Sequence, residues 1–269
     1  MPIKLGVIGG GVMGEALLSR LLVQKIYAPE DVVVGEFSPE RRHFLTQRYS
    51  VKATADNRDA IAAEEVVLLA IKPQIFDRVA PEFIATPLTD PPPLLVSILA
   101  GTPLAKLEAA APDWPVIRAM PNTPATVGAG MTAMASGAHA NPKHLEKARR
   151  IFQAVGEVVS IPEHLMDAVT GLSGSGPGYI AIMIEALTDG GVAAGLPRAI
   201  SAQLALQTVW GTAQLLKETE LHPAVLKDRV TSPGGTTIAG IAHLESSGLR
   251  SSLIEAVRTA CERSKELGA

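Results

Sequence analysis

The segment Gly9-Gly10-Gly11-Val12-Met13-Gly14 has the glycine spacing of a turn that binds the pyrophosphate of a dinucleotide. In such a turn the first glycine permits a tight bend, the second lets the backbone approach the phosphates, and the third lets a helix pack closely on a strand. The helix that follows offers unpaired N–H groups and positive potential to the phosphates. The spacing alone is weakly specific. Here a strand-like run precedes it, a helix-like stretch follows and a second strand-like run lies at the right distance, so the sequence predicts a dinucleotide site.

The residues after the second strand-like run would choose between NAD and NADP. A carboxylate near this place, here Glu36, accepts hydrogen bonds from the ribose 2′-OH, which favours NAD. Ser38, Arg41 and Arg42 follow, and a hydroxyl beside guanidinium groups suits the 2′-phosphate of NADP. The two arginines are equally consistent with a solvated helix face. The residues leave the choice open, with NADP(H) as the expected cofactor and NAD(H) as the alternative.

A lysine follows another buried strand-like run, in the segment Ile71-Lys72-Pro73. In a parallel sheet, the carboxyl end of such a strand faces the crevice in which ligands bind. Lys72 is therefore a candidate cofactor contact, although a surface lysine after a strand would have the same sequence.

Three further segments, 120–124, 170–178 and 231–237, hold more Gly, Ser, Thr and Pro than a linker needs. The first follows a strand-like run, and each of the other two precedes a helix-like stretch. A glycine-rich helix N-terminus with hydroxyls nearby attracts a carboxylate, because its N–H groups are unpaired and its dipole is positive there. Two ordinary loop-to-helix caps would explain the same residues. The likeness of the last two segments nevertheless suggests a small anionic substrate.

The sequence lacks the residue patterns that metal-dependent or nucleophilic catalysis would need. The six histidines stand in no metal-ligand spacing and the one cysteine, Cys261, offers no zinc set, so no metal site is predicted. The nucleophile pattern G-x-S-x-G is absent from the sequence. Without a metal or a nucleophile, a cofactor must supply the difficult step, and hydride transfer is the natural reaction of a dinucleotide. Cys261 lies in an amphipathic stretch and is more simply a packing residue.

These segments need a scaffold of alternating strands and helices, and residues 1–162 have that alternation. Strands are expected at 4–9, 31–36, 51–53, 66–71, 94–99, 116–120, 130–135 and 157–161. Helices are expected after the glycine turn and at 40–48, 58–63, 104–110 and 143–154, with start signals at Ser38, Asn57, Thr102 and Asn141. Several strands are apolar nearly throughout, which indicates a sheet buried on both faces. The expected α/β fold is a Rossmann-like, doubly wound and mainly parallel sheet that binds a dinucleotide.

Residues 163–269 are expected to form an all-α domain for substrate binding and dimerisation. No strand is expected there, and helices are predicted at 179–194, 198–217, 223–230, 236–246 and 249–267. The stretches 179–187 and 204–216 are apolar around most of their circumference, so they need cover on several sides. Because so small a helical domain does not easily supply that cover, we expect it to pack against another copy of itself.

The composition indicates a globular protein with a large core. Hydrophobic residues make up 47% of the 269 residues and charged residues 19%, which argues against disorder. Lys and Arg number 24 against 27 Asp and Glu, so the net charge of −3 excludes a nucleic-acid binder that works by bulk charge. No apolar run approaches the roughly 18–20 residues of a membrane span, and the N-terminus lacks a signal-peptide layout. We expect a cytoplasmic protein with neither nucleic-acid nor membrane partners.

Over essentially its whole length the sequence resembles the pyrroline-5-carboxylate reductases. The most specific part is the segment 223–240, which contains Thr231-Ser232-Pro233-Gly234-Gly235-Thr236-Thr237. The segments 167–177 and 189–192 also look like that family, as do 71–73 and 122–124. Two residues beside the expected adenosine ribose, Glu36 and Phe37, depart from the family pattern.

The resemblance implies an oxidoreductase that reduces the cyclic imine 1-pyrroline-5-carboxylate to L-proline, the last step of proline biosynthesis, with NADPH or NADH. The cofactor would contact Ile8, Gly9, Gly11, Val12, Met13, Gly14, Ser38, Asn57, Ala70, Ile71, Lys72, Pro73 and Ala100. The substrate would contact Asn122, Ser175, Ser232, Gly234, Gly235, Thr236 and Thr237, with its carboxylate held around 232–236. The helical domain would form a homodimer, and dimers of that family often assemble into a ring of five.

Thr237 is the catalytic residue that the resemblance implies, with its hydroxyl directed at the ring nitrogen. A threonine hydroxyl is far too weak an acid to protonate an imine unaided, since general acids work best with a pKa near the operating pH. We therefore expect Thr237 to orient the imine or iminium, or to relay a proton from water. Much of the catalysis would then come from positioning.

Two other functions stay open at this point. The glycine turn also resembles that of β-hydroxyacid dehydrogenases, which use a lysine soon after a glycine-rich segment; residues 177–183 contain none, which counts against them. A catalytically silent, NADP-sensing interaction protein could use the same fold, because fold alone does not set function. The intact segment 232–237 argues against that hypothesis.

Overall fold

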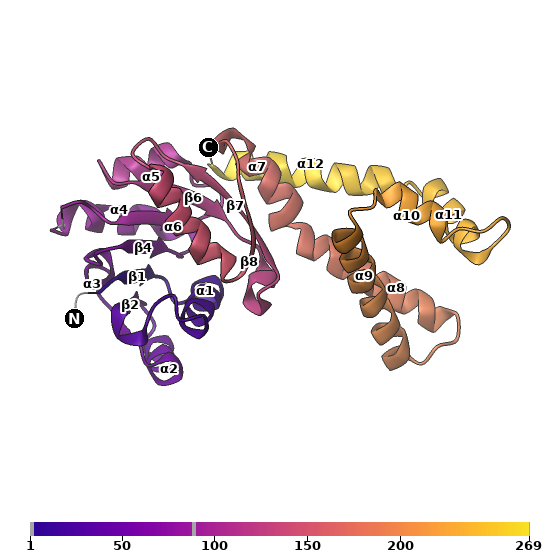
Figure 1. Cartoon of the computed structure of the whole chain (residues 1–269), viewed down its shortest axis with the longest axis horizontal. Coiled ribbons are helices and arrows are strands. Elements are labelled where there is room, and N and C mark those ends of the chain that lie inside the picture. Colours follow the sequence, from indigo (N-terminus) through magenta and orange to yellow (C-terminus); the bar gives the residue numbers. More distant parts are fainter. Residues whose placement is uncertain (1–2, 88–89, 269) are drawn as a thin grey trace. The chain divides into compact units, whose positions relative to one another are not determined.

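The computed structural model describes residues 3–87 and 90–268, and its central feature is one eight-stranded sheet (Figure 1). The strands are β1 (Leu5–Ile8), β2 (Val32–Gly35), β3 (Lys52–Thr54), β4 (Val66–Leu69), β5 (Leu94–Ser97), β6 (Val116–Met120), β7 (Gly130–Ser136) and β8 (Gly156–Ser160). Their order across the sheet is β3-β2-β1-β4-β5-β6-β7-β8. Only the pair β6 and β7 is antiparallel among these strands. The predicted Rossmann-like, mainly parallel sheet is confirmed.

Two apolar clusters, one on each face of the sheet, join it to its helices. Successive residues of a strand point to opposite faces, so Val66 and Leu68 belong to one cluster while Val67 and Leu69 belong to the other. Helices α1 (Val12–Val23), α2 (Pro39–Tyr49) and α6 (Pro142–Gln153) contribute to the first cluster. Helices α3 (Arg58–Ile61), α4 (Phe76–Ala85) and α5 (Leu104–Ala110) contribute to the second. Burial on both faces explains why strand β4 is apolar throughout.

Each predicted strand corresponds to an observed strand, with ends that differ by two residues or fewer. The prediction did not include α4, which begins after Ile75 without a side-chain cap and carries Pro81 inside the helix. Proline in a helix interior removes a backbone hydrogen bond and normally argues against a helix. Burial of Phe76, Val79 and Phe83 against the sheet stabilises α4 in spite of Pro81.

Two of the four predicted helix start signals work as side-chain caps. The Ser38 hydroxyl accepts a hydrogen bond from the Arg41 N–H, and Asn141 forms a capping box with His144. Helices α3 and α5 begin where predicted, after Asn57 and after Thr102-Pro103, but neither of these start signals caps its helix through a side chain. Asn57 already has helical backbone angles and makes no cap bond. At α5 the first N–H, that of Leu104, is satisfied from elsewhere in the chain, by the carboxylate of Glu163 at 2.6 Å.

The chain after β8 is helical, as predicted, and no strand occurs in it up to residue 268. The helices are α7 (Met166–Val169), a π-helical turn (Thr170–Gly174), α8 (Gly176–Ala193), α9 (Arg198–Thr219), α10 (Pro223–Arg229), α11 (Thr236–Ser246) and α12 (Leu249–Gly268). None of the described helices combines the length and the apolarity needed to cross a membrane.

Contacts divide the described chain into two compact units. The sheet unit comprises residues 3–174 together with 260–268, and the helical unit comprises residues 175–259. Residues after 162 contribute to the sheet unit: Met166 is buried in it, and the Ser264 hydroxyl donates to the Asp167 carboxylate at 2.7 Å. The domain boundary after residue 162 stays a prediction, and the compact units divide later in the chain.

Helices α8 and α9 lie side by side in the helical unit (Figure 1). The buried Ser201 hydroxyl of α9 donates to the Thr188 carbonyl of α8 at 2.6 Å, and Gly191 leaves space for the Ser201 side chain. Apolar side chains of both helices nevertheless remain exposed in the single chain, among them Ile182 and Trp210. Exposed apolar surface of this kind is typical of an interface with another polypeptide.

Candidate active site

The glycine turn between β1 and α1 is shaped by three different constraints. Gly9 has a φ of +102°, and a Cβ there would lie 2.6 Å from the Ala70 carbonyl oxygen. A Cβ at Gly14 would overlap the Gly9 carbonyl oxygen, so this glycine lets α1 pack on the turn. A Cβ at Gly11 would meet no atom of the protein within 4 Å. Contacts within the chain therefore explain why positions 9 and 14 require glycine. They do not explain Gly11, which faces open space.

The open space at Gly11 fits the pyrophosphate of a dinucleotide. Gly11 is also the N-cap of α1, and no side chain caps this helix end. The first N–H groups of a helix have no partner inside the helix and attract phosphate. A phosphate-binding turn needs a helix N-terminus without a side-chain cap, preceded by a glycine that leaves room for the phosphates. Gly11 and the start of α1 have this arrangement.

Glu36, just after β2, is engaged by the backbone. Its carboxylate accepts hydrogen bonds from the N–H of Gly10 and from the N–H of Ser38, each at 2.9 Å. These two bonds join the glycine turn to the start of α2. The carboxylate thus has a structural role in addition to the ribose contact that its position suggests.

Arg41 is held between the turn and α1. Its Nε donates to the Gly10 carbonyl at 2.7 Å, and its guanidinium pairs with the Glu15 carboxylate. Burial opposes the ionisation of Glu15, but hydrogen bonds from Tyr49 and Arg41 outweigh burial and hold the pKa of Glu15 below its ordinary value. The positive charge of Arg41 is therefore largely neutralised inside the protein.

Arg42 differs from its neighbour, because it pairs with no carboxylate in the described structure. Its guanidinium donates to the carbonyl oxygens of Glu36 and Phe37 at 2.8 and 2.7 Å. A cation that bonds only to neutral carbonyls keeps its full attraction for an anion. Arg42 therefore brings a positive charge close to Ser38, whose hydroxyl donates to the Glu40 carboxylate at 2.7 Å and whose N–H donates to Glu36.

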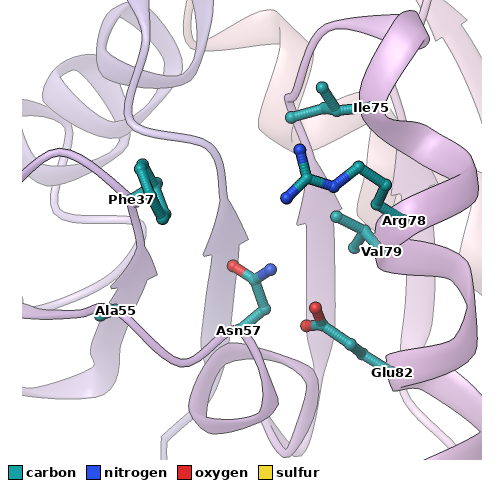
Figure 2. A pocket seen from close by; sticks show the side chains of 7 residues that line it. All are labelled: Phe37, Ala55, Asn57, Ile75, Arg78, Val79 and Glu82. Carbon is teal, nitrogen blue, oxygen red and sulfur yellow. The ribbon is translucent and has the colours of Figure 1, made fainter.

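A groove runs from the glycine turn towards α4 and brings predicted cofactor residues together. One pocket, of about 270 Å³, is lined by Gly9, Gly11, Gly35, Glu36, Phe37, Asn57, Ala70, Ile71, Lys72, Ile75 and Val79. A second, of about 350 Å³, shares Phe37, Asn57, Ile75 and Val79 with the first and adds Ala55, Arg78 and Glu82 (Figure 2). Lys72 is exposed, and its ammonium has no hydrogen-bond or ion-pair partner among the described residues. The shared lining makes the two pockets parts of one groove.

The other predicted cofactor residues lie outside the pocket linings. Ile8 is fully buried at the end of β1, and Val12, Met13 and Gly14 form the first turn of α1. Ser38 caps α2, Pro73 begins a short helical turn before α4, and Ala100 lies exposed after β5. All of these residues follow the carboxyl ends of parallel strands or lie at them, which is where dinucleotides bind in such sheets.

Arg78 and Glu82 line the groove and were not among the predicted site residues. Both lie on α4, the helix that the sequence pattern did not predict, so no signal connected them to the site. The Arg78 side chain has no bonding partner in the described structure. The Oε2 atom of Glu82 is buried and has no hydrogen-bond partner. An unsatisfied buried acceptor of this kind calls for an explanation.

The segment 231–237 forms a second polar cluster, in the helical unit. Gly234 has a φ of +69°, Gly235 is the N-cap of α11, and Thr236 and Thr237 begin the helix. No side chain caps α11. The hydroxyls of Ser232, Thr236 and Thr237 have no partner among the described residues. Free hydroxyls at an uncapped helix end can bind a carboxylate.

Asn122 and Ser175, the remaining predicted substrate residues, differ in their bonding. Asn122 lies in the sheet unit, where its amide donates to the Ser173 carbonyl at 3.0 Å and accepts from the Met131 N–H at 2.9 Å. Its two bonds hold the loop after β6 in place. Ser175 is the N-cap of α8 in the helical unit, and its side chain makes no cap bond. In residues 3–87 and 90–268, no three His, Cys, Asp or Glu side chains gather as a metal site would require.

Two family models match the chain. Residues 163–267 match the model for pyrroline-5-carboxylate reductase dimerisation, and residues 4–101 match the model for NADP oxidoreductase, coenzyme F420-dependent. The chain therefore combines an oxidoreductase dinucleotide domain with a dimerisation domain.

Proteins named pyrroline-5-carboxylate reductase match over the whole length. One from Synechocystis sp. is 60% identical over 268 residues, covering 100% of this chain and 99% of its own. One from Methanosarcina acetivorans is 42% identical and covers 98% of both chains.

Solved structures of the same family agree with the fold. The reductase from Coxiella burnetii has a TM-score of 0.90 at 34% identity and covers 100% of both chains. The Plasmodium falciparum enzyme, solved with NADP bound, has a TM-score of 0.88 at 32% identity, covering 99% of this chain and 98% of its own. With identity this high over both halves of the sequence, the chain belongs to the pyrroline-5-carboxylate reductase family.

Proposed function

We propose that this protein reduces 1-pyrroline-5-carboxylate to L-proline, the last step of proline biosynthesis, with NADPH as its preferred cofactor. The observation that carries the proposal is the whole-length identity of 60% to a protein named pyrroline-5-carboxylate reductase. It supports this function over a β-hydroxyacid dehydrogenase and over a catalytically silent sensor. The groove beside Gly11 supports the use of a dinucleotide.

The cofactor would be held by the glycine turn and the neighbouring strand ends. We assign this role to Ile8, Gly9, Gly11, Val12, Met13, Gly14, Ser38, Asn57, Ala70, Ile71, Lys72, Pro73 and Ala100. When bound, NADPH supplies the hydride that reduces the imine carbon. The N–H groups at the start of α1 and the ammonium of Lys72 neutralise phosphate charge, and the groove walls exclude water.

The preference for NADPH rests on the charges beside Ser38. Arg42 lacks a carboxylate partner in the described structure, so it can attract a 2′-phosphate, whereas Arg41 is already paired with Glu15. Glu36 is occupied by two backbone N–H groups, which lowers its capacity to serve a ribose hydroxyl. The NADP in the Plasmodium falciparum structure supports the same preference.

The substrate carboxylate would be bound by the segment 232–236. The hydroxyls of Ser232 and Thr236 and the free N–H groups at the start of α11 are the donors that a carboxylate requires. Asn122 would support this binding by fixing its loop, and Ser175, Gly234 and Gly235 would let the backbone come close to the substrate.

Thr237 would position the ring nitrogen of the substrate. Its hydroxyl can donate a hydrogen bond to the imine or accept one from the iminium, and it can pass a proton from water. A hydroxyl of ordinary acidity does not protonate the imine by itself. Thr237 therefore contributes by orienting the reacting bond rather than by acting as a strong acid.

The dimerisation segment 163–267 would join two copies of the chain. The apolar side chains of α8 and α9 that are exposed in one chain, such as Leu204 and Trp210, would be covered by the partner. Five such dimers would form a ring. Light scattering of the purified protein measures the mass: ten chains are expected, two chains would contradict the ring, and one chain would contradict the dimer.

Identification of the product tests the proposed reaction. The purified protein is incubated with 1-pyrroline-5-carboxylate and NADPH, and the amino acid formed is resolved on a chiral column. L-Proline in a one-to-one ratio to oxidised cofactor is expected. Oxidation of NADPH without proline, or no oxidation at all, would contradict the proposal.

A further inference from the structure

Glu82 lines the groove, and one of its two carboxylate oxygens is buried. Its Oε2 atom has no hydrogen-bond partner, although the Thr86 hydroxyl donates to the backbone carbonyl of the same residue at 2.7 Å. Arg58 lines a neighbouring pocket together with Glu82, but its guanidinium is bound to Asp56 at distances from 2.6 to 3.1 Å. The chain therefore leaves this carboxylate oxygen without a donor.

The groove around Glu82 has two facing walls. Phe37 forms one wall and is 89% exposed, which is unusual for a phenylalanine and leaves its ring free to stack on a ligand. The other wall is formed by Val79 and the stem of Arg78 on α4 and by Ile75 just before that helix. Figure 2 shows the Arg78 guanidinium, the Asn57 amide and the Glu82 carboxylate directed into the space between the walls.

This combination matches a purine ring with an amino group. A flat aromatic ring fits between Phe37 and the aliphatic side chains, and the guanidinium of Arg78 can stack on it. A carboxylate oxygen accepts hydrogen bonds and cannot donate one. The N6 amino group of adenine supplies such a donor, whereas hypoxanthine and guanine carry a carbonyl oxygen at that position and would repel the carboxylate.

We propose that Glu82 selects adenine by accepting a hydrogen bond from its N6 amino group, while Phe37 and Arg78 stack on the ring. This inference rests on the proposed function, because it requires that the groove hold an adenine dinucleotide. It adds a specificity-determining residue on α4 to the cofactor residues on the glycine turn and strand ends.

Equilibrium binding of two cofactors tests the inference without turnover. NADPH and its hypoxanthine analogue differ at the base, where a carbonyl replaces the N6 amino group. Both are titrated into the wild-type protein and into Glu82→Gln while cofactor fluorescence is followed. A glutamine can turn its own N–H group towards the carbonyl. The ratio of the two Kd values cancels any change in overall charge, since both ligands carry the same phosphates.

Asp77→Asn is the matched control. Asp77 lies on the same helix, is largely exposed and pairs with Lys106, so its replacement removes one carboxylate from α4 without touching the groove. The wild type and the control are expected to bind NADPH at least about tenfold more tightly than the analogue, since hydrogen bonds to charged groups are strong. In Glu82→Gln the ratio is expected to fall to about one.

Three results would overturn the inference, and they have different meanings. A wild-type protein that binds both ligands equally would overturn adenine selection, even if Glu82→Gln does not fold. A ratio that is unchanged in Glu82→Gln would show that another residue selects the base. A wild-type protein that binds neither ligand would overturn the proposed function together with the inference.

Discussion

The carboxylate of Glu36 accepts a hydrogen bond from the N–H of Gly10 at 2.9 Å, which ties the end of β2 to the glycine turn. The same carboxylate holds the N–H of Ser38, so one side chain connects the turn with the start of α2. An acidic residue at this place is usually interpreted as a ligand of the ribose. In this structure the Glu36 carboxylate holds the backbone of the glycine turn and of Ser38 in place.

Glu36→Gln tests that effect. An amide has one acceptor oxygen, so one of the two backbone N–H groups loses its partner. We expect the free energy of unfolding to fall by about 1–2 kcal/mol and the KM values for NADPH and NADH to rise together. Denaturant unfolding and steady-state kinetics measure the two effects. A selective rise in the KM for NADH would instead identify Glu36 as the ribose ligand.

Arg42→Gln is expected to weaken the binding of NADPH more than the binding of NADH. Loss of one charge-assisted bond to the 2′-phosphate should raise the KM for NADPH about tenfold and leave that for NADH nearly unchanged. Arg41→Gln is the comparison, because Arg41 is already paired with Glu15 and should affect both cofactors alike. Equal losses in the Arg42 variant would show that the 2′-phosphate binds elsewhere.

Gly11→Ala and Gly14→Ala should separate binding from stability. A methyl group at Gly11 meets no protein atom, so this variant should unfold like the wild type but bind NADPH at least about tenfold more weakly. A methyl group at Gly14 overlaps the Gly9 carbonyl and should lower the free energy of unfolding by about 1–3 kcal/mol. Thermal unfolding measures the stability of each variant, and fluorescence titration measures its affinity for NADPH. A Gly11→Ala protein with full affinity for NADPH would contradict the cofactor assignment.

Thr237→Val removes a hydroxyl that has no partner within the described chain. Folding and NADPH affinity should be unchanged, while kcat should fall about tenfold to a hundredfold, because a positioning bond to the substrate is lost. Thr237→Ser restores the hydroxyl and should recover most of the rate. If valine and serine variants are equally active, Thr237 has no part in the reaction.

Glu15 should make the stability of the turn depend on acid pH. The pKa of Glu15 is lower in the folded protein than in the unfolded chain. Its ionised carboxylate therefore adds fully to the free energy of unfolding at neutral pH, and this stabilisation is lost as the pH falls through the pKa of the folded protein. The difference in Tm between the wild type and Glu15→Gln should therefore shrink below about pH 4. A constant difference between pH 3 and pH 7 would contradict this sign.

The strands and most helices could be predicted because their signals are local. Apolar runs such as 66–69 and caps such as Asn141 depend on neighbouring residues alone. Helix α4 could not, because its interior Pro81 argues against a helix and only burial of Phe76 and Phe83 compensates for it. Because the sequence did not predict α4, it could not connect Arg78 and Glu82 to the groove beside the glycine turn.

The glycine turn and the segment 231–237 were found from residue type and spacing. The hydrogen bonds and ion pairs of neighbouring side chains could not be predicted in the same way, because the partners lie far apart in the sequence. Glu36 bonds to Gly10, and Arg41 pairs with Glu15. Charge alone predicted two equivalent arginines. Only the fold distinguishes the paired Arg41 from Arg42, whose guanidinium bonds only to carbonyl oxygens.

The most direct test of the central claim is a kinetic assay with the purified protein. 1-Pyrroline-5-carboxylate is supplied with NADPH and with NADH in parallel, and the loss of reduced-cofactor absorbance is followed. We predict rapid turnover with both cofactors and a higher kcat/KM for NADPH. Cofactor binding without turnover would contradict the reductase assignment, and a higher kcat/KM for NADH would contradict the role given to Arg42.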